Sequence, residues 1–240
     1  MKIQLFLFVL FIKTLNLLGQ KIDFSKDWLN QLEHPKYDIY VLKPDNYIDK
    51  YKTYNFSNLI IPKTLFIGYI GDNYQQIKIH FNYVIKDSIH NSYTIEGTSL
   101  VVDNKCNFSG TLIIRQIREY KSLHFGVDEN YKDKGIKSQG ILIGEYKFKE
   151  NNKNRYSGEF SGIMSLNWYV NKIGELLVDD IENYSDNYRN NQYVGIWTEY
   201  ETNIIKTCNW GEYRIPFSGD LDIGTGEFTP NPKYKDKGWK

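Results

Sequence analysis

The chain has 240 residues and a formal net charge of +1, because 30 Lys and Arg residues offset 29 Asp and Glu residues. This length is enough for one domain with a sizeable core, and the balanced charge argues against a nucleic-acid partner. Aromatic residues make up 16% of the chain. Strand propensity alone predicts such an enrichment; the alternative is an aromatic-lined pocket for a sugar or an apolar ligand.

The N-terminus has the order of a secretory signal peptide. Lys2 provides a positive start, residues 3–12 form a short apolar core, and residues 17–20 contain a small residue near a plausible cleavage point. An apolar core of about ten residues is too short to span a bilayer, which needs about twenty. We therefore expect residues 1–20 to be a signal peptide, and the mature chain, without a membrane span, to be secreted or periplasmic. The alternative is a buried N-terminal helix.

Residues 21–58 are the least regular part of the mature chain. Ser25 is a suitable N-cap for a short helix over residues 26–33, and Pro35 ends that helix. The remainder of the segment is typical of a loop. We expect it to lie against the sheet as a plug or flap, without forming a domain.

A strict alternation of apolar and polar residues follows. It is clearest in residues 75–85, where apolar side chains occupy every second position (Ile77, Ile79, Phe81, Tyr83 and Ile85). This period belongs to a β-strand with one buried face. Similar runs predict further strands, giving the set 65–70, 74–86, 93–102, 108–119, 140–149, 158–170, 176–184, 192–201 and 204–215.

The short Gly, Asn and Asp turns between these runs favour antiparallel neighbours. We predict an all-β fold in which an up-and-down meander over residues 59–218 closes into a barrel, with a C-terminal loop or tail at 219–240. Residues 120–138 are expected to lie at its mouth. Glycines within strands are expected at bulges or bends that curl the sheet (Gly97, Gly110, Gly144, Gly162 and Gly195). A two-sheet sandwich is the structural alternative.

The chain contains two cysteines, Cys106 and Cys208, each at or near a strand end. In an oxidising compartment an even pair of this kind favours a disulfide. Closing a loop of about one hundred residues would stabilise the fold by roughly 4–5 kcal/mol in the chain-entropy account. The alternative is two separate buried thiols.

One motif carries a family resemblance. Gly195-Ile196-Trp197, with the later Arg214, resembles the Gly-x-Trp motif and arginine of the lipocalins, although the lipocalin motif lies on the first strand and Trp197 lies on the penultimate one. The resemblance implies a lipocalin-like or calycin-like barrel in which the arginine packs over the indole. The segments 66–74 and 208–216 also resemble those of exported, uncharacterised bacterial proteins.

Six residues are candidates for ligand contact: Lys78, His80 and Asn82 on the polar face of one strand, together with Trp168, Trp197 and Arg214. The first three would contact a ligand if their face lined a cavity, but an alternating strand normally turns its polar face outward. Large apolar side chains on one face of another strand are big enough to fill a barrel interior (Phe160, Met164, Leu166 and Trp168).

No motif predicts a cofactor or a metal site. The four histidines are dispersed without metal-ligand spacing, and the acidic loop at 220–227 does not meet the EF-hand pattern. We find no nucleophile elbow or phosphate loop. Glu145, Glu159 and Glu199 are the only strand carboxylates we consider for glycoside hydrolysis, which needs two carboxyl groups facing each other across a cleft.

These patterns favour an exported β-barrel binding protein without enzymatic activity, whose partner is a small apolar or aromatic ligand. An alternative is a protein-interaction module, such as a periplasmic inhibitor or immunity-type protein, with an aromatic surface that includes Trp168, Tyr169, Tyr184 and Tyr188. A polysaccharide-acting enzyme is the third and least supported possibility. An open cavity would distinguish the first class from a barrel packed solid, which would favour the second.

Overall fold

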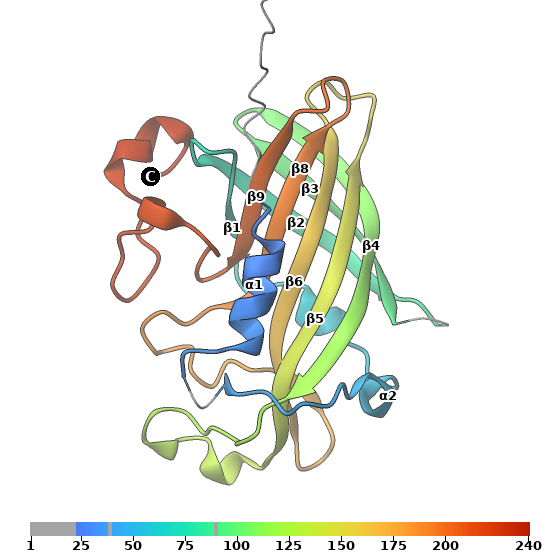
Figure 1. The fold of residues 1–240 in the computed structure, drawn as a ribbon, viewed down its shortest axis with the longest axis vertical. Coiled ribbons are helices and arrows are strands. Elements are labelled where there is room, and N and C mark those ends of the chain that lie inside the picture. The colour runs from blue at the N-terminus through green and yellow to red at the C-terminus, as the bar shows by residue number, and fades with distance from the viewer. Residues whose placement is uncertain (1–22, 38–39, 89–90) are drawn as a thin grey trace, which may run out of the picture.

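The computed structural model describes residues 23–37, 40–88 and 91–240. Within these ranges the chain forms an eight-stranded antiparallel β-barrel with meander order (Figure 1). Successive barrel strands pair with each other, and the first strand pairs with the last, so the ring closes. The predicted all-β barrel is confirmed. The predicted signal peptide lies outside the described residues.

The strand bounds agree with the predicted runs to within a few residues. The barrel consists of β1 (Ile67–Ile70), β2 (Gln75–Lys86), β3 (Ser92–Val101), β4 (Asn104–Glu119), β5 (Ile136–Glu150), β6 (Gly158–Asn171), β8 (Asn190–Glu199) and β9 (Ile205–Glu212). The remaining strand, β7 (Leu176–Val178), pairs only with β6 and stands outside the ring. The strand predicted over 176–184 is therefore too long, because β8 occupies the edge of β6 that a longer β7 would need.

Two bulges reverse the alternation that the sequence predicts. The register shifts between Phe81 and Tyr83 in β2, so Val84 becomes buried while Tyr83 and Ile85 are exposed. An extra residue in one strand of a pair turns every later side chain to the opposite face. The prediction that Tyr83 and Ile85 share the buried face was wrong for this reason. A second shift, between Ile114 and Gln116, does the same in β4.

The interior glycines create room for aromatic rings. A Cβ added at Gly97 would lie 2.5 Å from Cζ of Phe108, and one at Gly195 would lie 2.7 Å from the hydroxyl oxygen of Tyr146. Gly97 also lies opposite the β2 bulge, as Gly144 lies opposite the β4 bulge. We had expected bulges or bends at the glycines themselves. At Gly97 and Gly144 the bulge lies instead on the partner strand.

Large side chains fill most of the barrel. Those that are wholly buried include Phe148, Phe160, Trp168, Tyr193 and Trp210, and the rings of Tyr193 and Trp210 stack with centroids 4.9 Å apart. The set predicted to fill the interior (Phe160, Met164, Leu166 and Trp168) belongs to this core. Open space remains towards one end of the barrel.

The N-terminal segment closes the other end of the barrel. Helix α1 (Ser25–Glu33) lies against the outside of β8, where the Ser25 hydroxyl donates to the Val194 carbonyl at 3.2 Å, and α2 (Ile48–Tyr51) and α3 (Ser57–Ile60) follow (Figure 1). The ring of Tyr51 lies 4.6 Å from that of Trp168 inside the barrel. The predicted short helix and plug are thus present as packed elements.

The plug is fastened by one buried carboxylate. Glu119, at the end of β4, accepts hydrogen bonds from the ammonium groups of Lys43 (2.8 Å) and Lys50 (2.5 Å) and from the Tyr51 hydroxyl (2.7 Å). Burial raises its pKa, but these three donors outweigh burial and lower the pKa to about 2. Because the loop at 120–135 joins β4 to β5 at this same end, our prediction that it forms the mouth was wrong.

The C-terminal residues pack on the outside of the barrel. Short 3₁₀ turns at Gly219–Leu221 and Pro232–Lys237 bring Leu221 and Trp239 against Tyr69 of β1. The indole nitrogen of Trp239 donates to the Tyr74 carbonyl at 2.7 Å. The segment therefore covers the outer face of β1 and the start of β2.

Both cysteines are free and buried, so the predicted disulfide was wrong. Cys106 lies on β4 and Cys208 on β9, which are four strands apart in either direction around the ring. A disulfide needs Cα atoms about 4.4–6.8 Å apart, a condition that opposite walls of a barrel do not meet. Burial raises the pKa of both thiols.

Candidate ligand-binding cavity

A cavity of about 590 Å³ opens at the end of the barrel opposite the plug. Its floor is formed by Ile77 and Phe160, which belong to the hydrophobic core, and its walls include Ile70, Val101 and Trp197. The turns after β1, β3, β5 and β8 surround the opening. Among residues 23–37, 40–88 and 91–240, no segment covers this end in the way that α2 and α3 cover the other, so the cavity is open to the outside.

Glu150, the last residue of β5, supplies the most deeply buried charge in the cavity wall. One carboxylate oxygen accepts a hydrogen bond from the Ser99 hydroxyl. The other accepts from the indole nitrogen of Trp197 at 2.9 Å and from the backbone nitrogen of Gly158 at 2.8 Å. Burial raises the pKa of Glu150, and these hydrogen bonds lower it in part. The sequence carries a signal for the inward position of Glu150, because this residue continues the alternation of the inward-facing Tyr146 and Phe148.

The aromatic wall of the cavity is Trp197, and the cation above its ring is Lys206. The two residues are paired across β8 and β9, and the ammonium nitrogen lies 5.3 Å from the ring centroid. The lipocalin resemblance predicted Arg214 in this place, and that prediction was wrong. Arg214 follows β9 at the closed end, where its guanidinium binds Asp222 at 2.5 Å and the carbonyl oxygen of Gly226.

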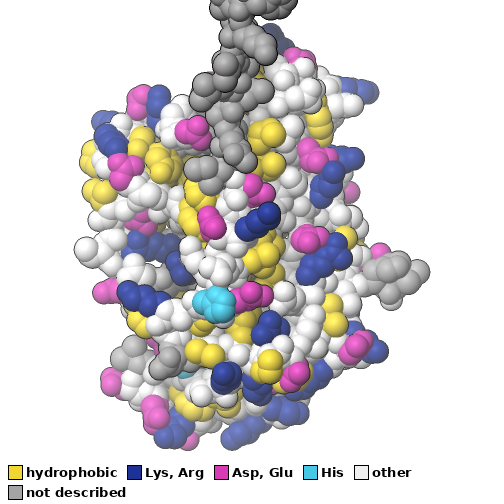
Figure 2. All heavy atoms as spheres, viewed as in Figure 1, with side chains coloured by type: hydrophobic (Ala, Val, Ile, Leu, Met, Phe, Trp, Pro, Cys, Tyr) yellow, Lys and Arg dark blue, Asp and Glu magenta, His cyan; other side chains and the backbone are white. Residues whose placement is uncertain are grey.

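Carboxylates outnumber cations in the cavity lining. The charged side chains there are Asp72, Glu150, Glu199 and Lys206, which sum to a formal charge of −2. Glu199 is buried and accepts a hydrogen bond from the Thr202 hydroxyl. Neither Glu150 nor Glu199 forms an ion pair with another residue of the described ranges. By contrast, charges of both signs are interspersed over the outer face shown in Figure 2.

The other candidate contact residues lie elsewhere. Lys78, His80 and Asn82 are exposed on the outer face of β2, and Trp168 is wholly buried near the plug. Of the six candidates, only Trp197 lines the cavity. Sequence analysis missed Ser99, Glu150 and Lys206, although the alternation within their strands places all three on the inner face.

The candidate glycosidase carboxylates do not converge. Glu145 is exposed on the outside of β5 and pairs with Arg115 at 2.7 Å. Glu159, also on the outside, pairs with Lys147 at 2.9 Å, whereas Glu199 faces the cavity.

Trp168 is buried, so the aromatic surface proposed for a protein partner lacks one of its predicted members.

A second hollow, of about 720 Å³, lies on the outer surface near the start of β4 and the end of β5. It is shallower than the cavity, and its lining is mostly polar and charged, including Asn107, Ser109 and Lys149. Ligand sites are typically concave and mainly apolar, with few polar groups. The cavity inside the barrel fits this description, and the outer hollow does not.

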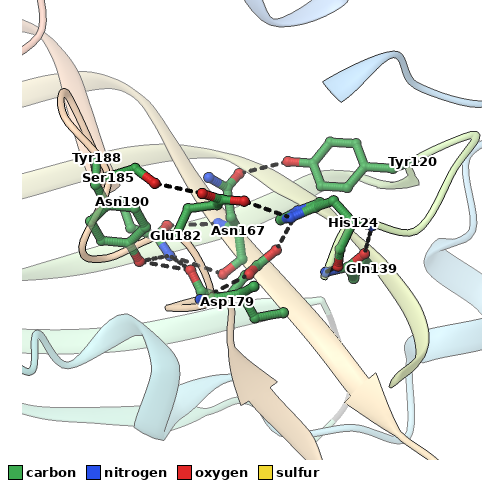
Figure 3. Close-up of polar contacts among 10 residues, drawn as sticks. Tyr120, His124, Gln139, Asn167, Asp179, Glu182, Ser185, Tyr188 and Asn190 are labelled. Atoms are coloured by element: carbon green, nitrogen blue, oxygen red, sulfur yellow. Dashed lines mark hydrogen bonds and ion pairs between the residues drawn. The ribbon is translucent and has the colours of Figure 1, made fainter. Parts of the chain in front are cut away.

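A buried polar cluster holds the 179–189 loop at the closed end (Figure 3). Nε2 of His124 lies 3.2 Å from a carboxylate oxygen of Asp179, and Nδ1 lies 3.9 Å from Glu182. These are ion-pair distances without the alignment of hydrogen bonds. The Asn190 amide donates to the carbonyls of Asn167 at 3.1 Å and Asp179 at 3.3 Å. The cluster joins β6, β8 and the loop, far from the cavity.

Neither a metal site nor a membrane-crossing helix emerges from the residues that the structure describes. No group of three or more His, Cys, Asp or Glu side chains within those ranges is arranged to hold a metal ion. No helix there combines the length and the apolar character that crossing a membrane requires. Comparison of the chain with family models, with curated proteins and with solved structures finds no match.

Proposed function

We propose that the protein is a binding protein that takes one small, largely apolar or aromatic ligand into the open end of its barrel. The observation that carries this proposal is the cavity of about 590 Å³ walled by Ile70, Val101 and Trp197. Its volume falls within the range of about 300–1,000 Å³ that is usual for small-molecule sites. Barrels of about eight strands have room for one small ligand, and this one keeps that room at a single end.

The packed remainder of the barrel supports the same proposal. The aromatic core below Phe160 gives the cavity a rigid floor, and the plug held by Glu119 closes the far end. A preformed site loses less conformational entropy when the ligand binds. The architecture resembles that of a lipocalin-like cup, in which the open end admits the ligand and the closed end supports it.

Titration with a neutral dye tests the proposal. We expect Nile red to gain fluorescence with the protein and to be displaced by 1-naphthalenemethanol. Val101→Trp places a larger side chain in the cavity wall, so it should weaken dye binding at least tenfold. Thr94→Trp is the matched control, because Thr94 is exposed on the outer face of the same strand.

Equal dye binding by the Val101→Trp and Thr94→Trp variants would contradict the proposal, as would the absence of any dye binding by the unmodified chain. Circular dichroism of both variants shows whether the barrel is intact. Loss of binding by Val101→Trp alone, with its fold retained, is the result that we expect.

We also propose that the protein acts after export, as a secreted or periplasmic protein. The support is the sequence of residues 1–20, with its short apolar core. Mass spectrometry of the protein purified from its native source tests this: a mature N-terminus near residue 21 is expected, and an intact Met1 would contradict it.

A further inference from the structure

We propose that the preferred ligand of the cavity carries a positive charge, as a protonated amine on an apolar or aromatic body. This inference rests on the proposed function and names the class of ligand for the same site. Three features of the cavity carry it: the uncompensated carboxylates, the remaining acceptor position on Glu150, and the indole beside it.

The first feature is the charge balance. The cavity lining holds three carboxylates and one ammonium group, and the ammonium of Lys206 lies over the ring of Trp197. Glu150 is surrounded by neutral donors only, namely a hydroxyl, an indole N–H and a backbone N–H. Buried carboxylates are normally paired with a cation. A ligand ammonium group would supply the missing partner.

The second feature is the hydrogen-bonding capacity of Glu150. A carboxylate offers about four acceptor positions. Trp197 and Gly158 occupy two on Oε2, and Ser99 occupies one on Oε1. One position on Oε1 therefore has no donor among the described residues, and Glu150 is part of the cavity lining from which a ligand could supply one. A charge-assisted hydrogen bond to that oxygen is stronger than one between neutral groups.

The third feature is the placement of Trp197. Its nitrogen donates to Glu150 and its ring forms the adjacent wall, so the ring and the carboxylate are presented together. The Lys206 ammonium already lies over the ring, 5.3 Å from its centroid, so Trp197 contributes an apolar wall for the body of the ligand next to the carboxylate that would bind its ammonium group. The apolar floor of Ile77 and Phe160 would receive the body of the ligand.

Three ligands that share one ring system test the inference by isothermal titration calorimetry. They are 1-naphthalenemethylamine, which is an ammonium ion at neutral pH, the neutral 1-naphthalenemethanol and the anionic 1-naphthaleneacetate. We expect the ammonium ion to bind about tenfold more tightly than the alcohol, since one charge-assisted hydrogen bond contributes about this much. The anion should bind most weakly.

Glu150→Gln removes the charge while keeping the size of the side chain, so the preference for the ammonium ion over the alcohol should fall to about twofold or less. Glu145→Gln is the matched control, because Glu145 is an exposed carboxylate on the outer face of the same strand, and it should leave the preference unchanged. Thermal unfolding shows whether each variant is folded.

A pH titration of the unmodified chain gives a second measurement that needs no variant. Burial raises the pKa of Glu150, so protons compete with the ammonium ligand for this carboxylate as the pH falls. Affinity for the ammonium ion should decrease while affinity for the alcohol stays constant. Asp72, Tyr156, Glu199 and Lys206 are the other titratable groups of the lining. Any pH dependence that persists in the Glu150→Gln variant belongs to these groups.

The outcomes are distinguishable. If the alcohol binds and the ammonium ion binds no more tightly, the inference on ligand charge is overturned while the proposed function stands. An ammonium preference that Glu150→Gln leaves unchanged overturns the role of this carboxylate. If none of the three ligands binds to the unmodified chain, the proposed function is overturned as well.

Discussion

At the scale of single residues, the surroundings of a side chain decide its role more than its residue type does. Glu145 and Glu150 lie on one strand five positions apart, yet Glu145 is exposed beside Arg115 whereas Glu150 is buried among neutral donors. Desolvation penalises a charge unless partners replace the lost water. The difference between an ordinary surface carboxylate and a candidate ligand contact is therefore one of position.

The two thiols give a prediction at this scale. Because Cys106 and Cys208 are buried and unpaired, the native protein should react very slowly with a thiol reagent such as Ellman's reagent, while the unfolded protein should release two equivalents. Burial raises both thiol pKa values and so lowers the thiolate fraction. Reaction of fewer than two thiols in denaturant without reductant would reveal a disulfide and contradict the structure.

At the scale of elements, much of the barrel could be predicted, because alternation with period two identifies both the strands and their inner faces. The bulges could not, since the register shift after Phe81 depends on how β2 meets β3, and no local pattern marks it. The end that the plug closes could not be predicted either. It depends on contacts between Glu119 and lysines about seventy residues away in sequence.

One prediction concerns the fit between a glycine and its neighbour inside the sheet. A Cβ at Gly144 would lie 2.7 Å from Cδ1 of Leu112. Gly144→Ala should therefore lower the free energy of unfolding by about 1–3 kcal/mol through overpacking. In a Leu112→Ala background the methyl group added at residue 144 has room. Gly144→Ala should therefore lower the free energy of unfolding by less in that background than in the unmodified chain. Additive effects, measured by urea unfolding of all four proteins, would contradict this packing.

A second prediction concerns the attachment of α2 to β4. Glu119 has its pKa lowered to about 2 in the folded chain, below its value in the unfolded chain. Its stabilisation is therefore complete above about pH 4.5 and is lost as the pH falls towards 2. Glu119→Gln should lower the free energy of unfolding at neutral pH by about 1–3 kcal/mol, and the variant should lose less stability than the parent on acidification.

Glu145→Gln serves as its control, because this exposed carboxylate and Arg115 are both more than half exposed. An exposed ion pair contributes about 0–1 kcal/mol, so the variant should follow the parent at every pH. If Glu119→Gln unfolded with the same pH dependence as the parent, the network between Glu119, Lys43 and Lys50 would not stabilise the fold as described.

At the scale of the whole molecule, the chain divides one barrel into a packed part and an open part. Aromatic side chains and the N-terminal plug fill the closed end, while the open end keeps a cavity with a carboxylate at its wall. The closed antiparallel barrel could be predicted from the sequence. The residues of the site could not, because they come from all eight strands of the barrel and meet only when the ring closes.

The most direct test of the account is to locate a bound ligand by NMR. The chain has five tryptophans, so a proton–nitrogen spectrum should show five indole signals, and Trp197→Phe assigns one of them. Only Trp197 lines the cavity, whereas Trp168 and Trp210 are wholly buried below it. On titration with 1-naphthalenemethylamine, the account predicts a large shift of the Trp197 indole signal and little change in the other four. Saturable binding that shifts the other indoles and leaves Trp197 unmoved would contradict it.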